Sequence, residues 1–367
     1  MSKLFSPIAL RDVELPGRIV VSPMCQYVAE DGLMNDWHLM HLGQLSMGAA
    51  HLLFTEATHI SAEGRISPGC AGLWNDEQEA AMQRIAGFCH QHGTATMGIQ
   101  LAHAGRKASC NTPLNGSAPL TGVQGAWQTL GPSATGFAPD WHVPQEMDRE
   151  TMTRVKQEFV DAATRADRAG YDVFDLHGGH GYLLNQFFSP LSNLRTDEYG
   201  GDVEKRIRYP MEVFEAVRAA LPSGKPLGIR ISATDWVDGG TTVEDTVAFA
   251  KALESAGCDF IDITTGGVDH RQKITTAPGY QVEFASAVKK EVGMPIMAVG
   301  MIFEPRQAEE VIADGHADFV MLARGVMHNP RWAWHAAIEL GVEMDYPPQY
   351  LRCSPGLWRP ASGQWDT

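Results

Sequence analysis

The segment Tyr171-Asp-Val-Phe-Asp-Leu-His-Gly-Gly-His-Gly-Tyr182 joins a predicted strand to a group of polar side chains. Its first part, 171–177, is a short and mostly apolar run that follows a helical pattern over 152–169. A mostly apolar run of this length is typical of a parallel strand that is covered on both sides. His177, His180 and Tyr182 come directly at the end of the predicted strand. Side chains that can transfer protons therefore lie at a strand terminus.

The same unit recurs along the chain. Seven further runs of this kind lie at 18–24, 50–58, 95–102, 226–232, 258–264, 295–300 and 317–323. Helical patterns separate most of these runs, for example at 206–221, 243–256 and 305–314. Eight strands that alternate with helices most simply close into a (β/α)₈ TIM barrel, and a doubly wound open sheet is the competing fold.

Polar or conformationally special residues gather where the predicted strands end. They are Ser22-Pro-Met-Cys25, Glu56-Ala57, Gln100 with His103, His177 with His180, Arg230, Gly300 and Ala323-Arg324. In α/β barrels the chemistry sits at the carboxyl ends of the strands, and phosphate commonly binds after strands seven and eight. This distribution indicates a single convergent site and favours the barrel.

Composition and charge narrow the class of protein. The chain has 367 residues, of which 44% are hydrophobic and 20% charged, and its formal net charge is −15 at pH 7. This acidic balance argues against nucleic acid or an anionic membrane as the main partner. Residues 1–10 lack the apolar stretch of a signal peptide, and no apolar run approaches the length of a membrane span. We therefore expect a cytoplasmic protein.

Two segments lie outside the repeating unit. Residues 110–147 are rich in Gly, Pro, Ser, Thr and Trp and show no periodicity, which indicates an excursion after the third strand that covers the site. Residues 353–367 form a C-terminal tail. We expect residues 1–367 to form one barrel domain with these two additions.

Several segments resemble the old yellow enzyme family of flavoproteins. They are Ser22-Pro-Met-Cys-Gln-Tyr27, Gly98-Ile-Gln-Leu-Ala-His-Ala-Gly-Arg-Lys107, His177-Gly-Gly-His-Gly-Tyr182, Ser189-Pro-Leu-Ser-Asn-Leu-Arg-Thr-Asp-Glu-Tyr-Gly-Gly201 and Pro278-Gly-Tyr-Gln281. The resemblance spans essentially the whole chain and is nearest to the bacterial thermophilic-like ene-reductases, which include the xenobiotic reductases. It implies a (β/α)₈ barrel that holds FMN non-covalently, with NADPH or NADH as the reductant and an electrophilic alkene as the acceptor.

The resemblance also implies which residues contact FMN. Arg230 would balance the negative charge that a reduced flavin carries near N1, and Gln100 would bind the pyrimidine edge. The remaining ring contacts would come from Ser22, Pro23, Met24, Cys25 and Ala57. The phosphate would lie against Gly300, Met301, Ala323 and Arg324, where backbone amides and a guanidinium suit it. Many relatives have glycine at the position of Ala323.

The implied catalytic residues follow from the same motifs. His177 and His180 would donate hydrogen bonds to one carbonyl oxygen of an unsaturated substrate, which makes its β-carbon a hydride acceptor. Tyr182 would then protonate the α-carbon, and Tyr27 would hold the substrate from the other side. The Cys25 thiol would donate a weak hydrogen bond toward the flavin, with no need for a covalent intermediate.

Two alternatives from other classes of protein stay open. The pattern His177-x-x-His180 also suits a metal-dependent barrel hydrolase, although we expect no metal. The nominal third ligands for that alternative are His38, His41 and His103. A non-catalytic flavin sensor is the second alternative. His38-Leu-Met-His41 falls on a predicted helix, and we interpret it as structural.

The cysteines bear on two further classes. The six cysteines are scattered and contain no C-x-x-C pair, so we expect neither a disulfide framework nor a structural zinc site. A larger flavin dehydrogenase would add an iron–sulfur cluster after the barrel. Only Cys353 follows Cys258, so the ligands for such a cluster are missing.

The segment Pro348-Gln-Tyr-Leu-Arg352 resembles the one through which this branch inserts an arginine into the site of a neighbouring subunit. The resemblance implies a homodimer or homotetramer with shared active sites. Because the chain continues beyond this segment, Trp358 in the tail is a second candidate for the same position.

Overall fold

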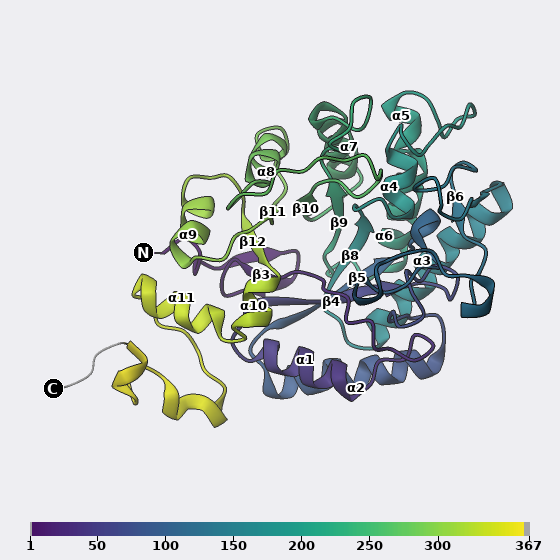
Figure 1. The fold of residues 1–367 in the computed structure, drawn as a ribbon. Coiled ribbons are helices and arrows are strands. Elements are labelled where there is room, and N and C mark those ends of the chain that lie inside the picture. Colours follow the sequence, from purple (N-terminus) through teal and green to yellow (C-terminus); the bar gives the residue numbers. More distant parts are fainter. Residues whose placement is uncertain (1, 363–367) are drawn as a thin grey trace.

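The computed structural model describes residues 2–362 and contains a closed barrel of eight parallel strands (Figure 1). In chain order the strands are β3 (Ile19–Val21), β4 (Leu52–His59), β5 (Thr96–Ala102), β8 (Val173–Gly178), β9 (Leu227–Ser232), β10 (Ile261–Thr264), β11 (Ile296–Ala298) and β12 (Phe319–Leu322). Each strand pairs with the next one along the chain, and β12 pairs with β3 to close the barrel. The predicted (β/α)₈ barrel is confirmed, and each of the eight predicted runs overlaps one of these strands to within one residue at its carboxyl end or contains it.

Helices surround the barrel (Figure 1). They are α1 (Asp36–Ser46), α2 (Asp76–His92), α3 (Arg149–Arg168), α4 (Leu183–Phe188), α5 (Val203–Arg206), α6 (Arg208–Ala220), α7 (Val243–Ser255), α8 (Val282–Lys289), α9 (Pro305–Ala313), α10 (Arg324–His328) and α11 (Trp332–Leu340). The helix predicted over 206–221 is α6, and the short α5 precedes it. Over residues 2–362, no helix is both long enough and apolar enough to cross a membrane.

Side-chain caps determine where the longer helices begin. The Asp148 carboxylate accepts a hydrogen bond from the backbone N–H of Thr151 at the start of α3. Thr242 and Asp245 form a reciprocal capping box at the start of α7. Such caps satisfy backbone N–H groups that have no partner within the helix. The face of α3 that packs on the barrel carries Met152, Val155, Phe159, Ala162, Ala163 and Ala166, the three-to-four spacing of an amphipathic helix.

The lower half of the barrel interior, at the amino ends of the strands, is apolar. Its side chains come from Val20, Leu52, Phe54, Val173, Phe260, Met297, Phe319 and Met321. An antiparallel hairpin of β1 (Ile8–Leu10) and β2 (Val13–Leu15) adds Leu10 and Leu15 to this cluster. The sequence analysis did not identify this hairpin, which packs against the apolar interior.

The excursion after β5 is ordered and largely irregular. It contains two 3₁₀ turns, Pro113–Asn115 and Gly122–Gln124, and a short strand pair, β6 (Leu130–Gly131) with β7 (Gln145–Glu146). Arg106 donates hydrogen bonds to the carbonyl oxygens of Thr135 and Gly136, at 3.2 and 3.3 Å. Arg106 therefore holds this excursion close to the carboxyl end of β5.

We expect Gly228→Ala to destabilise the barrel. A methyl group at Gly228 in β9 would collide with the Phe260 ring inside the packed apolar cluster. Overpacking of this kind costs about 1–3 kcal/mol of unfolding free energy. Gly87→Ala is the matched control, because Gly87 lies within α2 and a methyl group there meets no atom within 4 Å. It should be neutral or stabilising by up to about 1 kcal/mol. Denaturant unfolding of both variants measures the difference, and equal stabilities would contradict it.

Candidate active site

The predicted site residues converge at the carboxyl ends of the barrel strands, with one exception. Residues 22–27 follow β3, Ala57 and Gln100 lie in β4 and β5, and His177 lies in β8, with His180 and Tyr182 directly after it. Arg230 lies in β9, Gly300 and Met301 follow β11, and Ala323 and Arg324 follow β12. The exception is Arg352, which lies on the C-terminal tail.

The two histidines meet at the end of β8. His180 Nδ1 lies 3.4 Å from His177 Nε2, and the two rings stand almost perpendicular, with centroids 5.2 Å apart. His180 Nε2 lies 3.0 Å from the hydroxyl of Thr264, and the backbone N–H of His180 donates to the hydroxyl of Ser232 at 2.8 Å. Hydroxyls from β10 and β9 therefore hold the second histidine in place.

The loop that carries His180 needs glycine after it. His180 has a left-handed backbone with φ of +55°, and Gly181 follows with φ of +71°. A side chain at Gly181 would collide with the backbone of Gly267, in the loop after β10. The Gly-His-Gly sequence therefore allows the loops after β8 and β10 to approach closely.

The surroundings keep both imidazoles uncharged. Burial lowers the pKa of His177 and of His180 well below the usual value, and the positive charges of Arg230 and Lys107 lower both further. A neutral imidazole has one N–H to donate and one nitrogen that accepts. His177 Nδ1 is buried and has no partner among the described residues. The pair can therefore act as neutral hydrogen-bond donors to a ligand.

Tyr182, Tyr27 and Cys25 lie together beside the histidines. The Tyr182 ring lies 5.0 Å from the His177 ring, and all three side chains pack against a small buried cluster that includes Cys70. Burial raises the pKa of Tyr182 and of Tyr27, and nearby thiols raise both further, so each phenol keeps its proton. Burial, followed by the charge of Glu56, raises the pKa of Cys25, so this residue stays a thiol.

A layer of polar side chains lies inside the barrel below the histidines. The side-chain N–H₂ of Gln100 donates a hydrogen bond to Oδ2 of Asp175 in β8, with 2.7 Å between Nε2 and Oδ2. Nε of Arg230 lies 2.8 Å from Oδ2 of Asp262, its register partner in β10. The two groups form an ion pair, although they are not aligned for a hydrogen bond. Gln100 and Arg230 were predicted from the sequence, whereas Asp175 and Asp262 were not. The available signal was a carboxylate within each of two otherwise apolar strand runs.

Lys107 is a third residue of the site that was not predicted from the sequence. Its ammonium group donates to the carbonyl oxygens of His180 and Gly267, both at 2.8 Å, and lies 5.1 Å from the centre of the Tyr182 ring. Burial lowers the pKa of Lys107 to about 8. Lys107 thus ties the loop of the histidines to the loop after β10. Its place within the Gly98–Lys107 motif was the only available signal.

The residues expected to hold a phosphate lie at the ends of β11 and β12. Gly300 and Met301 have positive φ angles of +121° and +52°, and Gln281 packs where a side chain at Gly300 would lie. Arg324 is exposed at the start of α10 and forms no ion pair within residues 2–362. A cation without a partner is thus available on this side of the barrel mouth.

Arg352 lies away from this cluster within its own chain. It is exposed on the 3₁₀ helix Pro348–Cys353, in the tail that extends beyond α11 in Figure 1. The tail packs on α11 through the rings of Tyr346 and Tyr350, whose centroids lie 4.3 and 5.9 Å from that of Trp334. Trp358 is half-exposed, and residues 363–367 of the predicted tail lie outside the described residues.

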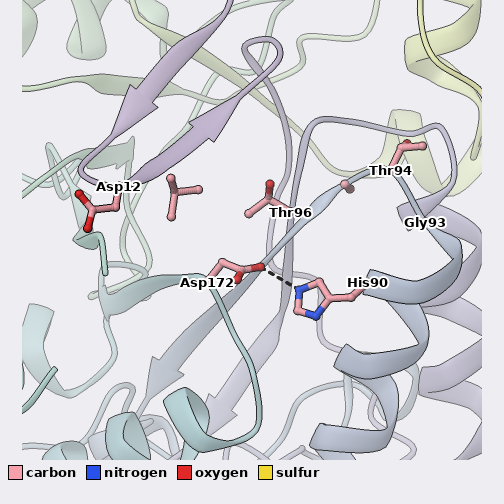
Figure 2. Close-up of a pocket in the computed structure, with 8 residues that line it drawn as sticks. Asp12, His90, Gly93, Thr94, Thr96 and Asp172 are labelled. Carbon is pink, nitrogen blue, oxygen red and sulfur yellow. Dashed lines mark hydrogen bonds and ion pairs between the residues drawn. The ribbon is translucent and has the colours of Figure 1, made fainter. Parts of the chain in front are cut away.

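A hollow of about 510 Å³ lies at the opposite end of the barrel (Figure 2). Its polar walls come from Asp12, His90, Thr94, Thr96 and Asp172. His90 points at Asp172, with 2.8 Å between Nε2 and the carboxylate, and the same carboxylate accepts the backbone N–H of Met97. His90 and Asp172 thus satisfy each other at the amino ends of the strands, at the end of the barrel opposite the histidine pair.

The remaining histidine motif serves the structure. His38 forms the capping box of α1 with Asn35, and its Nε2 lies 3.2 Å from the carboxylate of Glu56. This agrees with the structural interpretation of His38-Leu-Met-His41. Within the described part of the chain, no group of three or more His, Cys, Asp or Glu residues could hold a metal ion.

Comparisons with known proteins give a consistent result. The model of the NADH:flavin oxidoreductase / NADH oxidase family matches residues 3–343. An NADPH dehydrogenase of Geobacillus sp. (strain WCH70) is 42% identical over 351 residues, which cover 95% of this chain and 98% of that protein. An NADPH dehydrogenase of Listeria monocytogenes is 40% identical over 96% of this chain and 99% of its own. The structure of morphinone reductase superposes with a TM-score of 0.78 at 25% identity, covering 95% of this chain and 92% of that one.

We expect His177 and His180 to remain neutral at about pH 6, below the usual histidine pKa of about 6.5. His90 is the control, because its hydrogen bond to Asp172 raises its pKa, so it should be protonated at that pH. Nitrogen-15 NMR of ring-labelled protein, assigned with single histidine variants, distinguishes the two forms. Protonation of His177 or His180 together with His90 would contradict the neutral pair.

Proposed function

The chain belongs to the NADH:flavin oxidoreductase / NADH oxidase family, the old yellow enzymes, and from this we propose that it is an ene-reductase. Membership establishes an NAD(P)H-dependent FMN oxidoreductase. The proposed acceptors are α,β-unsaturated carbonyl or nitro compounds, with nitrate esters as a further class. The observation that carries the proposal is the grouping of two neutral histidines with a protonated tyrosine at one strand end.

The polar atoms at the strand ends fit FMN. FMN, when bound, accepts a hydride from the nicotinamide and passes it to the acceptor. The hydroxyl of Ser22 and Nδ1 of His177 are buried without a partner in the described residues. The outer nitrogens of Arg230 donate no hydrogen bond to residues 2–362. Buried polar groups without partners cost about 1–3 kcal/mol each, so this arrangement favours a polar ligand.

We assign the FMN contacts by the position of each group. Arg230 and Gln100 would face the pyrimidine half of the ring, while Ser22, Pro23, Met24, Cys25 and Ala57 would line the rest. Gly300, Met301, Ala323 and Arg324 would hold the phosphate, for which an exposed and unpaired guanidinium is suited. The Cys25 thiol, which keeps its proton, can donate only a weak hydrogen bond to the cofactor.

The acceptor would bind above this layer, between the histidines and the tyrosines. His177 and His180 would each donate an N–H to the carbonyl or nitro oxygen and so draw electron density from the double bond. Tyr182 would deliver the proton to the α-carbon, and its raised pKa keeps that proton available across the neutral range. Tyr27 would hold the acceptor from the side opposite the histidines.

Tyr182→Phe tests this assignment. The variant keeps the ring that packs beside His177 but removes the phenolic proton. Reduction of the enzyme by NADPH needs no proton from a tyrosine, whereas reduction of an enone does. We expect enone turnover in the oxidative half-reaction to slow by about 10²–10⁴-fold, the range of positioned general acids. The rate of reduction by NADPH should change by less than about threefold, far below the effect of losing a general acid.

Stopped-flow measurement of both half-reactions distinguishes the possible roles of Tyr182. Equal slowing of both would make Tyr182 a residue that positions the ring system. No slowing of either would assign the proton to Tyr27 or to solvent. A nitroalkene serves as the internal control, because its reduced nitronate leaves without protonation and should be turned over by the variant at a rate near that of the wild type.

We also propose that two chains share their sites through Arg352. Its exposure on a segment that packs on α11 through Tyr350 supports a partner-directed role. Trp358, half-exposed on the same tail, is the second candidate.

Mixing two inactive variants tests the shared site. In a hybrid of Tyr182→Phe and Arg352→Ala chains, one site would receive both intact residues. Activity should therefore rise after the variants are unfolded and refolded together, toward about a quarter of the wild-type value if chains pair at random and sites act independently. No recovery would place Arg352 outside the neighbouring site. The same mixture with Trp358→Ala in place of Arg352→Ala identifies which tail residue is shared.

A further inference from the structure

Two carboxyl groups lie inside the barrel below the proposed FMN contacts. Asp175 in β8 and Asp262 in β10 are each 1% exposed. Asp175 lies in register with Gln100 on one side and Gly228 on the other, and Asp262 lies in register with Arg230. The two carboxyls therefore lie on either side of β9, opposite residues of that strand that are two apart.

The two carboxyl groups have different partners. Asp262 has the guanidinium of Arg230 at 2.8 Å. Oδ2 of Asp175 accepts a hydrogen bond of 2.7 Å from the neutral amide of Gln100, and its Oδ1 is buried without a partner among the described residues. Within residues 2–362, no cation lies within ion-pair distance of Asp175. A buried carboxylate without a cation is costly, and such a group usually takes up a proton instead.

Burial and the neighbouring charges raise the pKa of the two carboxyl groups to different extents. Burial raises the pKa of Asp175 well above its usual range, and the negative charge of Asp262 raises it further, against smaller effects of Gln100 and Arg230. Burial raises the pKa of Asp262 only to about 6, because Arg230 opposes the rise. Near neutral pH the pair therefore holds one proton, and Asp175 carries it.

We propose that Asp175 is a positioning residue that stays protonated below the cofactor and fixes the orientation of the Gln100 amide. With its N–H₂ group directed at Asp175, Gln100 presents its carbonyl oxygen to the ligand. The pyrimidine of a flavin offers a matching N3–H donor. The single negative charge in the layer, on Asp262, is balanced by Arg230, so the layer is neutral overall.

The protonation state can be measured without any cofactor. Infrared spectra should contain the carbonyl stretch of a buried protonated carboxyl group in wild-type protein, both with FMN and after its removal. Asp175→Asn should lose this band, and Asp262→Asn, the matched control, should retain it. Absence of the band from the wild type, or its persistence in Asp175→Asn, would overturn the proposal.

The positioning role rests on the proposed FMN contacts and needs a second readout. An asparagine resembles a protonated aspartate in size and in offering both a donor and an acceptor, so Asp175→Asn should keep the FMN dissociation constant within about threefold. Asp175→Leu leaves Gln100 without its acceptor and should weaken FMN binding by at least about tenfold, the value of one neutral hydrogen bond. Equal FMN affinity of the Leu and Asn variants would overturn the positioning role.

The flavin midpoint potential separates a protonated Asp175 from an ionised one. Asp262→Asn removes the anion beside Arg230 and should favour reduced over oxidised FMN by about tenfold, which is about 30 mV for a two-electron couple. Asp175→Asn should leave the potential unchanged. A positive shift in Asp175→Asn as large as that in Asp262→Asn would show that Asp175 is ionised and would overturn the proposal. Failure of the wild type to bind FMN would instead contradict the family function, and the infrared band would still decide the protonation of Asp175.

Discussion

The ion pair between Arg230 and Asp262 is the interaction on which the site depends. Burying a guanidinium costs several kcal/mol unless a carboxylate accompanies it, so β9 and β10 must align these two residues. They are register partners, and His177 is the register partner of Arg230 on the other side. A one-residue slip of β9 would turn Arg230 away from the barrel interior and toward the helices. The strand register therefore determines where the positive charge lies, and that charge helps keep both histidines neutral.

Two adjacent cations organise the loops around this charge. Arg106 donates to carbonyl oxygens of the excursion and of Val268, and Lys107 donates to those of His180 and Gly267. These carbonyls belong to three loops, which follow β5, β8 and β10. Since backbone carbonyls are neutral, the two cations connect three loops without adding a carboxylate near the site. The positive charge of Lys107 also remains available to depress the pKa of the neighbouring histidines.

The sequence predicted the barrel well because its strands are covered on both sides and read as separate apolar runs. The hairpin of β1 and β2 was missed because strands of three residues carry too little pattern. Gln100 could be identified from its motif and Arg230 from its place at a strand end, whereas Asp175 and Asp262 could not. The role of a carboxylate within an apolar run can be assigned only when the strand register shows which residue lies beside it. The position of Arg352 relative to a site depends on a second chain, about which one sequence gives only a resemblance.

Conformational strain is concentrated at the same end of the barrel as the chemistry. Tyr27, His180 and Met301 all have left-handed backbone conformations, which cost about 1–3 kcal/mol each for residues other than glycine. The unpartnered polar atoms of Ser22 and His177 lie at this end as well. The opposite end contains an apolar cluster closed by a hairpin, in whose turn Arg11 has a left-handed backbone conformation. Because the apolar half supplies stability independently, the carboxyl ends of the strands can hold strained and unpartnered groups ready for a ligand, which would relieve part of their cost on binding.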